Sequence, residues 1–173
     1  TLIVCFVAAG VCLGYVAAVG WYMHVSDILY LLLDILLLSF FGTALSSLIN
    51  FFLNTQGQIS AVGAIISAGY GFICGAYMPI SSFSDGLQKA ISFLPGTYGT
   101  SLVRNHALGG VFAEMEEQGI PTAVVDGMRD AIDCNLYFFD EKVQIGEMYT
   151  VLGVSVVVLV GVYILLNSLK KKV

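Results

Sequence analysis

One ionisable side chain stands inside an otherwise apolar stretch of this sequence. Asp34 lies within LYLLLDILLL, residues 29–38. A charged side chain at the centre of a membrane-spanning helix costs about 3 kcal/mol unless it is neutral, paired or exposed to a polar cavity. Asp34 could therefore contact a substrate or a proton. Equally, it could form a structural hydrogen bond to a neighbouring helix, or stay protonated near the outer interface. We expect a partner in the external part of the chain, with Arg104 as the first candidate.

The other reactive residue types form no catalytic or metal-binding pattern. His24 and His106, the two histidines, belong to no HExxH pattern, and the four cysteines show no CxxC spacing. No GxxxxGK[ST] phosphate-binding loop occurs. We therefore expect no catalytic residue, no metal site and no cofactor in this chain, and we do not expect it to be an enzyme by itself.

Composition indicates an all-α integral membrane protein. Hydrophobic residues make up 58% of the 173 residues and charged residues 11%, with a mean hydropathy of +0.89. Because about 20 apolar residues cross a bilayer as a helix, we predict four transmembrane helices, at residues 1–23, 28–53, 57–78 and 149–169. The chain opens at Thr1 directly in an apolar segment, so we expect it to be part of a longer protein.

Small residues recur every four positions in two of the predicted spans. Such stripes allow helix backbones to approach closely. We predict helix packing along the first stripe, at Gly10, Gly14 and Ala18, and along the second, at Gly63, Ser67, Gly71 and Gly75.

The stretch between the third and fourth spans predicts two short amphipathic helices. The first begins at Ser82 or Ser84 and ends near Phe93, where Pro95-Gly96 interrupts it. The second covers residues 97–108 and is closed by Gly109-Gly110. Residues 79–110 could be a surface loop with interfacial helices, or a re-entrant helix pair that acts as a gate.

Charge distribution predicts the topology. Lys170, Lys171 and Lys172 place the basic tail, residues 170–173, in the cytoplasm. Residues 79–148 are then external. Their second part, residues 111–148, carries nine acidic residues and no DxDxDG loop, which favours a solvated external cap over a calcium site. The acids are Glu114, Glu116, Glu117, Asp126, Asp130, Asp133, Asp140, Glu141 and Glu147.

Three segments give the chain a family resemblance. They are the small-residue span that continues into Gly75–Ser81, the break FLPGTY at 93–98, and the ending RNHALGG at 104–110. With these segments the chain resembles the permease subunits of type-2 ATP-binding cassette exporters. The four spans are similar to the third to sixth of the six usual in that family. Its break usually carries Asn before the proline and a bulky residue after it, where this chain has Leu94 and Gly96.

The resemblance implies a multi-pass permease of a bacterial plasma membrane that exports a drug, lipid, peptide or glycan. A separate ATPase subunit would bind ATP and Mg²⁺, and a second permease half would complete a homo- or heterodimer in contact with membrane lipid; no nucleic acid is implied. The spans at 28–53 and 57–78 would line the path. The external gate would include Pro79, Phe83, Phe93, Pro95 and Tyr98.

A second hypothesis keeps the same fold. The chain could be an ion-coupled carrier, or a membrane sensor that binds a ligand with its acidic cap. A carrier typically shows several buried ionisable groups and inverted repeats, whereas only Asp34 is evident here.

Overall fold

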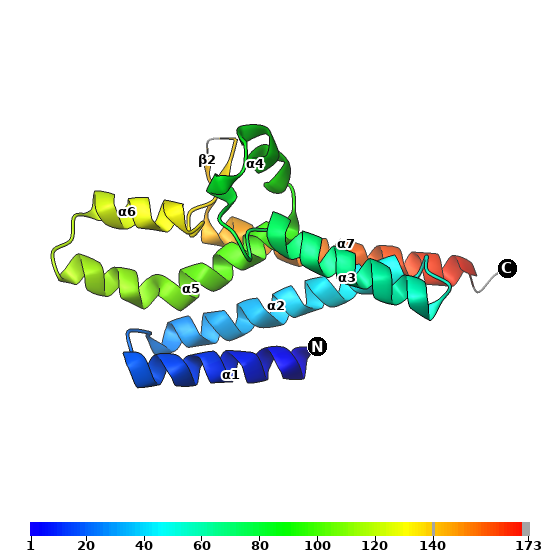
Figure 1. The fold of residues 1–173 in the computed structure, drawn as a ribbon, viewed down its shortest axis with the longest axis horizontal. Coiled ribbons are helices and arrows are strands. Elements are labelled where there is room, and N and C mark those ends of the chain that lie inside the picture. Colours follow the sequence, from blue (N-terminus) through cyan, green and yellow to red (C-terminus); the bar gives the residue numbers. More distant parts are fainter. Residues whose placement is uncertain (140, 171–173) are drawn as a thin grey trace.

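The computed structural model describes residues 1–139 and 141–170. Asp140, and the part of the predicted basic tail at 171–173, lie outside the described residues. Seven α-helices form most of the described chain (Figure 1). They are α1 (Leu2–Val19), α2 (Val25–Asn50), α3 (Gln56–Ile73), α4 (Asp85–Ile91), α5 (Pro95–Glu117), α6 (Thr122–Ala131) and α7 (Ile145–Lys170), with a 3₁₀ turn η1 (Ile80–Ser82) and a hairpin of β1 (Tyr137–Phe138) and β2 (Glu141–Lys142).

Within the described residues, three helices are long and apolar enough to cross a membrane: α1, α2 and α7. The third predicted span corresponds to α3, whose 18 residues include Gln56 and Gln58 in the first turn. A capping box fixes this end, because Gln58 N–H donates to Thr55 Oγ1 and Gln58 Oε1 accepts from Thr55 N–H, both at 3.3 Å. A membrane-spanning role for α3 stays a prediction.

Helix α3 ends earlier than the span predicted at 57–78. Its last residue is Ile73, and Gly75 follows with φ of +79°. The N–H groups of Gly75 and Ala76 donate to the carbonyls of Phe72 and Gly71, which is the bonding that ends many helices at a left-handed glycine. Gly75 is therefore a helix-ending residue, and its predicted place in a packing stripe is wrong.

Helices α2, α5 and α7 pack against one another and form the centre of the fold. Leu102 of α5 and Leu152 of α7 are fully buried there. Helix α5 runs antiparallel to the first half of α2 (Figure 1). Gly99 lies beside Leu38, at the middle of α2, and Gly110 lies beside the backbone of Tyr22, just before α2 begins. Helix α5 thus starts level with the middle of α2 and runs toward the α1–α2 turn.

The prediction that Gly109-Gly110 ends this helix is wrong, because α5 continues to Glu117. A Cβ atom at Gly110 would overlap the carbonyl of Tyr22, so the glycine permits close packing instead of ending the helix. The end lies nine residues further on at Gly119, whose φ is +84°.

The acidic region is partly helical. Helix α6 folds back along the last turns of α5 (Figure 1), and Val125, Phe112 and Cys134 form a small buried cluster between them. The role of this region as an external cap stays a prediction.

The predicted packing stripes have few described neighbours. A Cβ at Gly10, Gly14 or Gly63 would meet no atom of a neighbouring described element within 4 Å, and the atoms nearest to one at Gly71 belong to the ring of Tyr77. Gly63, Ser67 and Gly71 instead line a pocket. Helix packing on these glycines and on Ala18 stays a prediction.

Candidate transport pocket and external gate

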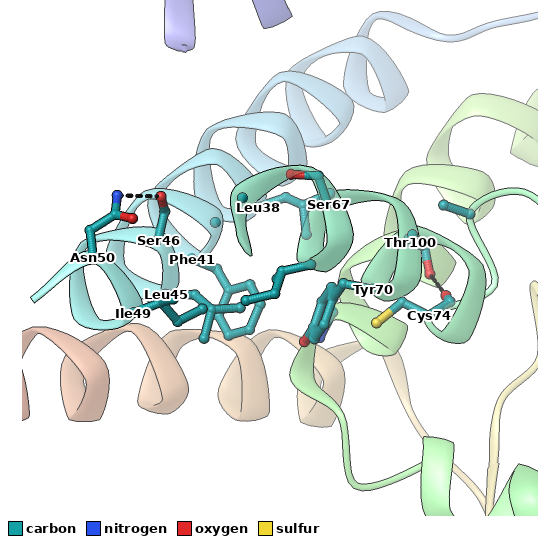
Figure 2. Close-up of a pocket in the computed structure, with 16 residues that line it drawn as sticks. Leu38, Phe41, Leu45, Ser46, Ile49, Asn50, Ser67, Tyr70, Cys74 and Thr100 are labelled. Carbon is teal, nitrogen blue, oxygen red and sulfur yellow. Dashed lines mark hydrogen bonds between the residues drawn. The ribbon is translucent and has the colours of Figure 1, made fainter. Parts of the chain in front are cut away.

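A pocket of about 300 Å³ separates α2 from α3 (Figure 2). The two helices meet at Phe41 and Tyr70, whose ring centroids are 6.1 Å apart. Leu38 and Leu45 extend the wall along α2, and Ile66 extends it along α3. Helices α2 and α3 are thus in contact at these two rings and separated by the pocket along the residues that line it.

Among the residues that the structure describes, none that lines this pocket is charged. Figure 2 shows Ser46 and Asn50 at one end, with the Asn50 amide 3.4 Å from Ser46 Oγ. The hydroxyl groups of Tyr70 and Thr100 lie toward the other end, and apolar side chains of α2 lie between. The pocket therefore combines an apolar middle with neutral hydrogen-bonding groups at its ends.

The first turn of α5 closes one end of the pocket. Gly96 N–H donates to Tyr70 Oη at 3.2 Å, and Thr100 Oγ1 donates to the Cys74 carbonyl at 2.7 Å. A Cβ at position 96 would lie 2.5 Å from the Tyr70 ring and 2.9 Å from Cys74 Sγ. Only a glycine allows α5 to approach α3 this closely.

The predicted gate residues lie on both sides of the α4–α5 bend. Pro95 is the first residue of α5, where its missing N–H costs no helical bond. Tyr98 is 5% exposed and donates its hydroxyl to the Ser92 carbonyl at 2.5 Å, which holds the bend closed. Phe83 packs against the same core.

The two other gate residues face outward. Pro79 is exposed before η1. Phe93 is 63% exposed, and its ring makes edge contacts with Phe138 and Phe139, at centroid distances of 5.3 and 5.9 Å. The structure places Tyr98 in the core with Phe83 packed against it, leaves Pro95 partly buried, and leaves Pro79 and Phe93 at the surface; a gating role for all five stays a prediction.

Asp34 is fully buried and hydrogen bonded on both carboxylate oxygens. His106 Nδ1 of α5 lies 2.6 Å from Oδ2, and the Tyr149 hydroxyl of α7 donates to Oδ1. The ring of Tyr30 stacks on His106 at 5.1 Å. Three helices thus meet at one carboxylate, which satisfies the requirement that a buried acid be paired.

Arg104, the predicted partner of Asp34, bonds elsewhere. Its Nη1 lies 3.2 Å from Asp133 Oδ2, and its Nη2 donates to the Gly75 carbonyl. Asp133 Oδ2 also accepts from Ile80 N–H at 2.8 Å. The expected pairing with Asp34 is therefore wrong, and Arg104 instead ties the end of α3 to the turn before β1.

Burial raises the pKa of the Asp133 carboxyl above its ordinary value of 3.8. The hydrogen bond from Ile80 N–H and the charge of Arg104 lower the pKa, but by less than burial raises it. For the ionised carboxylate, the effect of burial on the pKa is therefore larger than the combined opposite effect of its hydrogen bonds and of Arg104.

A family model described as ABC-2 family transporter protein matches residues 1–168. This chain belongs to the ABC-2 transporter family. Comparison with curated proteins and with solved structures gave no match. ABC-2 chains of this kind are the membrane-spanning permease subunits of ATP-binding cassette transporters and work with an ATPase subunit. The protein is therefore a multi-pass membrane permease.

Sequence reasoning missed His106 and Tyr149 in this ABC-2 permease. A signal for His106 was present. Gly99, His106 and Gly110 are seven and four residues apart, so they share one helical face, and the two glycines pack against Leu38 and Tyr22. Arg104 lies two residues before His106, about 200° around the helix. Tyr149 had no comparable signal, because it is the first residue of the predicted span at 149–169, where a tyrosine at the membrane surface is common.

Proposed function

We propose that this ABC-2 permease exports a neutral, partly apolar molecule, and that a separate ATPase subunit supplies the energy. The pocket between α2 and α3 carries the proposal. The described residues that line its 300 Å³ include no charged side chain, so a charged cargo would lose its hydration without gaining a partner. An apolar segment fits the middle of the pocket, and neutral polar groups fit its ends. Of the drug, lipid, peptide and glycan classes, neutral lipids and drugs fit best.

The proposed topology places the pocket on a path from the cytoplasmic side. With the C-terminus of α7 in the cytoplasm, α2 runs inward and its Asn50 end faces the cytoplasm. Helix α6 is then external, α5 runs between the outer end and the middle of α2, and Gly96 and Thr100 at its start close the pocket toward the outside. A second permease half, identical or related, would complete the path, in what we propose is the plasma membrane of a bacterium.

A transport assay with a neutral and an anionic cargo tests the proposal. The full-length protein and its ATPase subunit are reconstituted in liposomes, and ATP-dependent movement of a neutral lipid with a fluorescent acyl chain is measured. The same acyl chain on an anionic phosphate headgroup serves as comparison cargo. Transport of the neutral probe alone supports the proposal, whereas equal or faster transport of the anionic probe contradicts it.

The variant Ser67→Leu places three extra carbons in the pocket. We expect about a ten-fold loss of transport, the size of discrimination that small groups produce in an apolar site. Ser60→Leu is the matched control, since Ser60 is exposed on the same helix and does not line the pocket. Equal losses in both variants would show that the pocket is not the route.

One observation favours a second candidate, an ion-coupled carrier. Asp34 and His106 form a buried pair of ionisable groups, as occurs on proton pathways. A carrier would transport in response to an ion gradient with the ATPase removed, whereas the proposed exporter would not.

A further inference from the structure

Helix α5 belongs to the pocket and to the Asp34 cluster at once. Gly96 and Thr100, in its first two turns, close the pocket. His106, ten residues after Gly96 and therefore about 15 Å along the helix, bonds to Asp34. Because α5 is a continuous helix from Pro95 to Glu117, a movement at His106 is transmitted to the pocket wall.

We propose that Asp34, His106 and Tyr149 form a latch that holds α5 against α2, with Tyr149 of α7 positioning the Asp34 carboxylate, and that transport requires this latch to release. The inference rests on the proposed transport function, of which it is the regulation. His106 and Tyr149 are positioning residues in this scheme: they contact Asp34, and the pocket responds through α5.

Two other contacts of α5 are van der Waals contacts at glycine residues. Gly99 lies against Leu38, and Gly110 lies against the Tyr22 backbone. Packing of this kind changes gradually as one helix slides along another. Hydrogen bonds depend steeply on distance and angle, so a small displacement of α5 breaks the bond between His106 and Asp34, whose carboxylate Tyr149 of α7 holds in place. The cluster therefore gives α5 a discrete held position, as a two-state element requires.

The start of α5 is bonded to the preceding bend, because the hydroxyls of Thr97 and Tyr98 donate to the carbonyls of Ile91 and Ser92. A displacement of α5 therefore carries this bend with it. Tyr70 and Cys74 contact Gly96 across the pocket end. Once His106 leaves Asp34, three hydrogen bonds still join α5 to the end of α3, from Gly96 to Tyr70, from Thr100 to Cys74 and from Arg104 to Gly75. The end of the pocket that faces outward opens when these bonds break after release of the latch.

Native Cys74 reports on the state of the latch. Its side chain is 2% exposed, and the first turn of α5 covers it. Alkylation of Cys74 by N-ethylmaleimide is measured by mass spectrometry of the full-length protein with its ATPase subunit in lipid nanodiscs. The rate rises when α5 leaves the pocket. This measurement needs neither ATP nor cargo, so it can fail independently of the proposed function.

Tyr149→Phe removes one bond to Asp34 and keeps the ring. We expect Cys74 alkylation to rise about five-fold, the population shift that one lost hydrogen bond produces. His106→Ala should raise it further, and His106→Asn, which retains a donor near the position of Nδ1, should return it toward the wild-type rate. Tyr163→Phe is the matched control, because it removes a hydroxyl of α7 outside the cluster and should leave the rate unchanged.

An unchanged rate in folded Tyr149→Phe and His106→Ala proteins would overturn the latch. A reversible lock tests the need for release. In Leu38→Cys/Gly99→Cys, a Cβ at position 99 lies against the side chain at position 38, so oxidation should join α2 to α5. We expect transport to stop on oxidation and to return on reduction. Transport that continues with the disulfide formed would contradict the proposal, even if the export function itself is correct.

Discussion

The ion pair of Arg104 and Asp133 should respond unequally to loss of its two members. Asp133 is buried, with a side chain 6% exposed, whereas Arg104 is 23% exposed and also bonds to the Gly75 carbonyl. Arg104→Gln leaves a buried carboxylate with backbone N–H donors, from Ile80 and Ser81, but no positive charge beside it, which should cost about 3 kcal/mol of unfolding free energy. Asp133→Asn leaves a partly hydrated guanidinium and should cost about 1 kcal/mol or less. Asn also tolerates the φ of 55° at this position.

The double variant makes the test decisive. Arg104→Gln/Asp133→Asn removes the unpaired charge, so it should be more stable than Arg104→Gln alone by about 2 kcal/mol. Unfolding is followed by denaturant titration of the purified permease in detergent, with the exposed Lys89→Gln as a control expected within about 0.5 kcal/mol of wild type. A double variant that is less stable than Arg104→Gln would refute the reasoning.

The raised pKa of Asp133 also predicts how the stability of the folded protein changes with pH. Burial raises the pKa in the folded protein above 3.8, so the folded protein binds this proton more tightly than the unfolded chain does. The resulting contribution to stability is fully present below pH 3.8 and is lost as pH rises through the folded pKa. The stability of wild type relative to Asp133→Asn should therefore fall with rising pH in that window.

Two further predictions concern packing and topology. Gly110→Ala should destabilise the protein by about 2 kcal/mol, because its Cβ would overlap the Tyr22 carbonyl, whereas Gly109→Ala meets nothing within 4 Å and should be neutral or stabilising; equal effects in denaturant titrations would contradict the packing of α5. A membrane-impermeant maleimide should label Ala123→Cys, on exposed α6, in intact cells and Asn54→Cys only after lysis; the reverse pattern would invert the topology. Native Cys134 cannot replace the introduced cysteine, because it is 1% exposed.

The sequence predicted the apolar helices well, because long apolar runs leave few alternatives. It also identified Asp34 as the residue that needs a partner. It did not identify that partner, because two polar residues two positions apart, Arg104 and His106, look equally suitable until the face of α5 is known. That face is set by contacts of Gly99 and Gly110 with residues more than 60 positions away.

The glycines were the least predictable residues. Gly75, Gly110 and Gly119 look alike in the sequence, yet Gly75 and Gly119 end helices with positive φ and Gly110 lies inside one. Whether a glycine ends a helix or permits close packing depends on what lies beside it, and single-residue patterns do not contain that information. The pocket was likewise hidden, since the stripe of Gly63, Ser67 and Gly71 predicted contact where the structure has a gap.

Co-purification shows whether this chain works as the permease half of an ATP-driven transporter. The full-length protein is isolated from native membranes in mild detergent, and its partners are identified by mass spectrometry while ATPase activity is measured. The account predicts a nucleotide-binding subunit at about one per permease chain, with ATPase activity that disappears when that subunit is removed. A permease that is isolated intact and folded, transports its cargo, and carries no ATPase subunit would contradict the account.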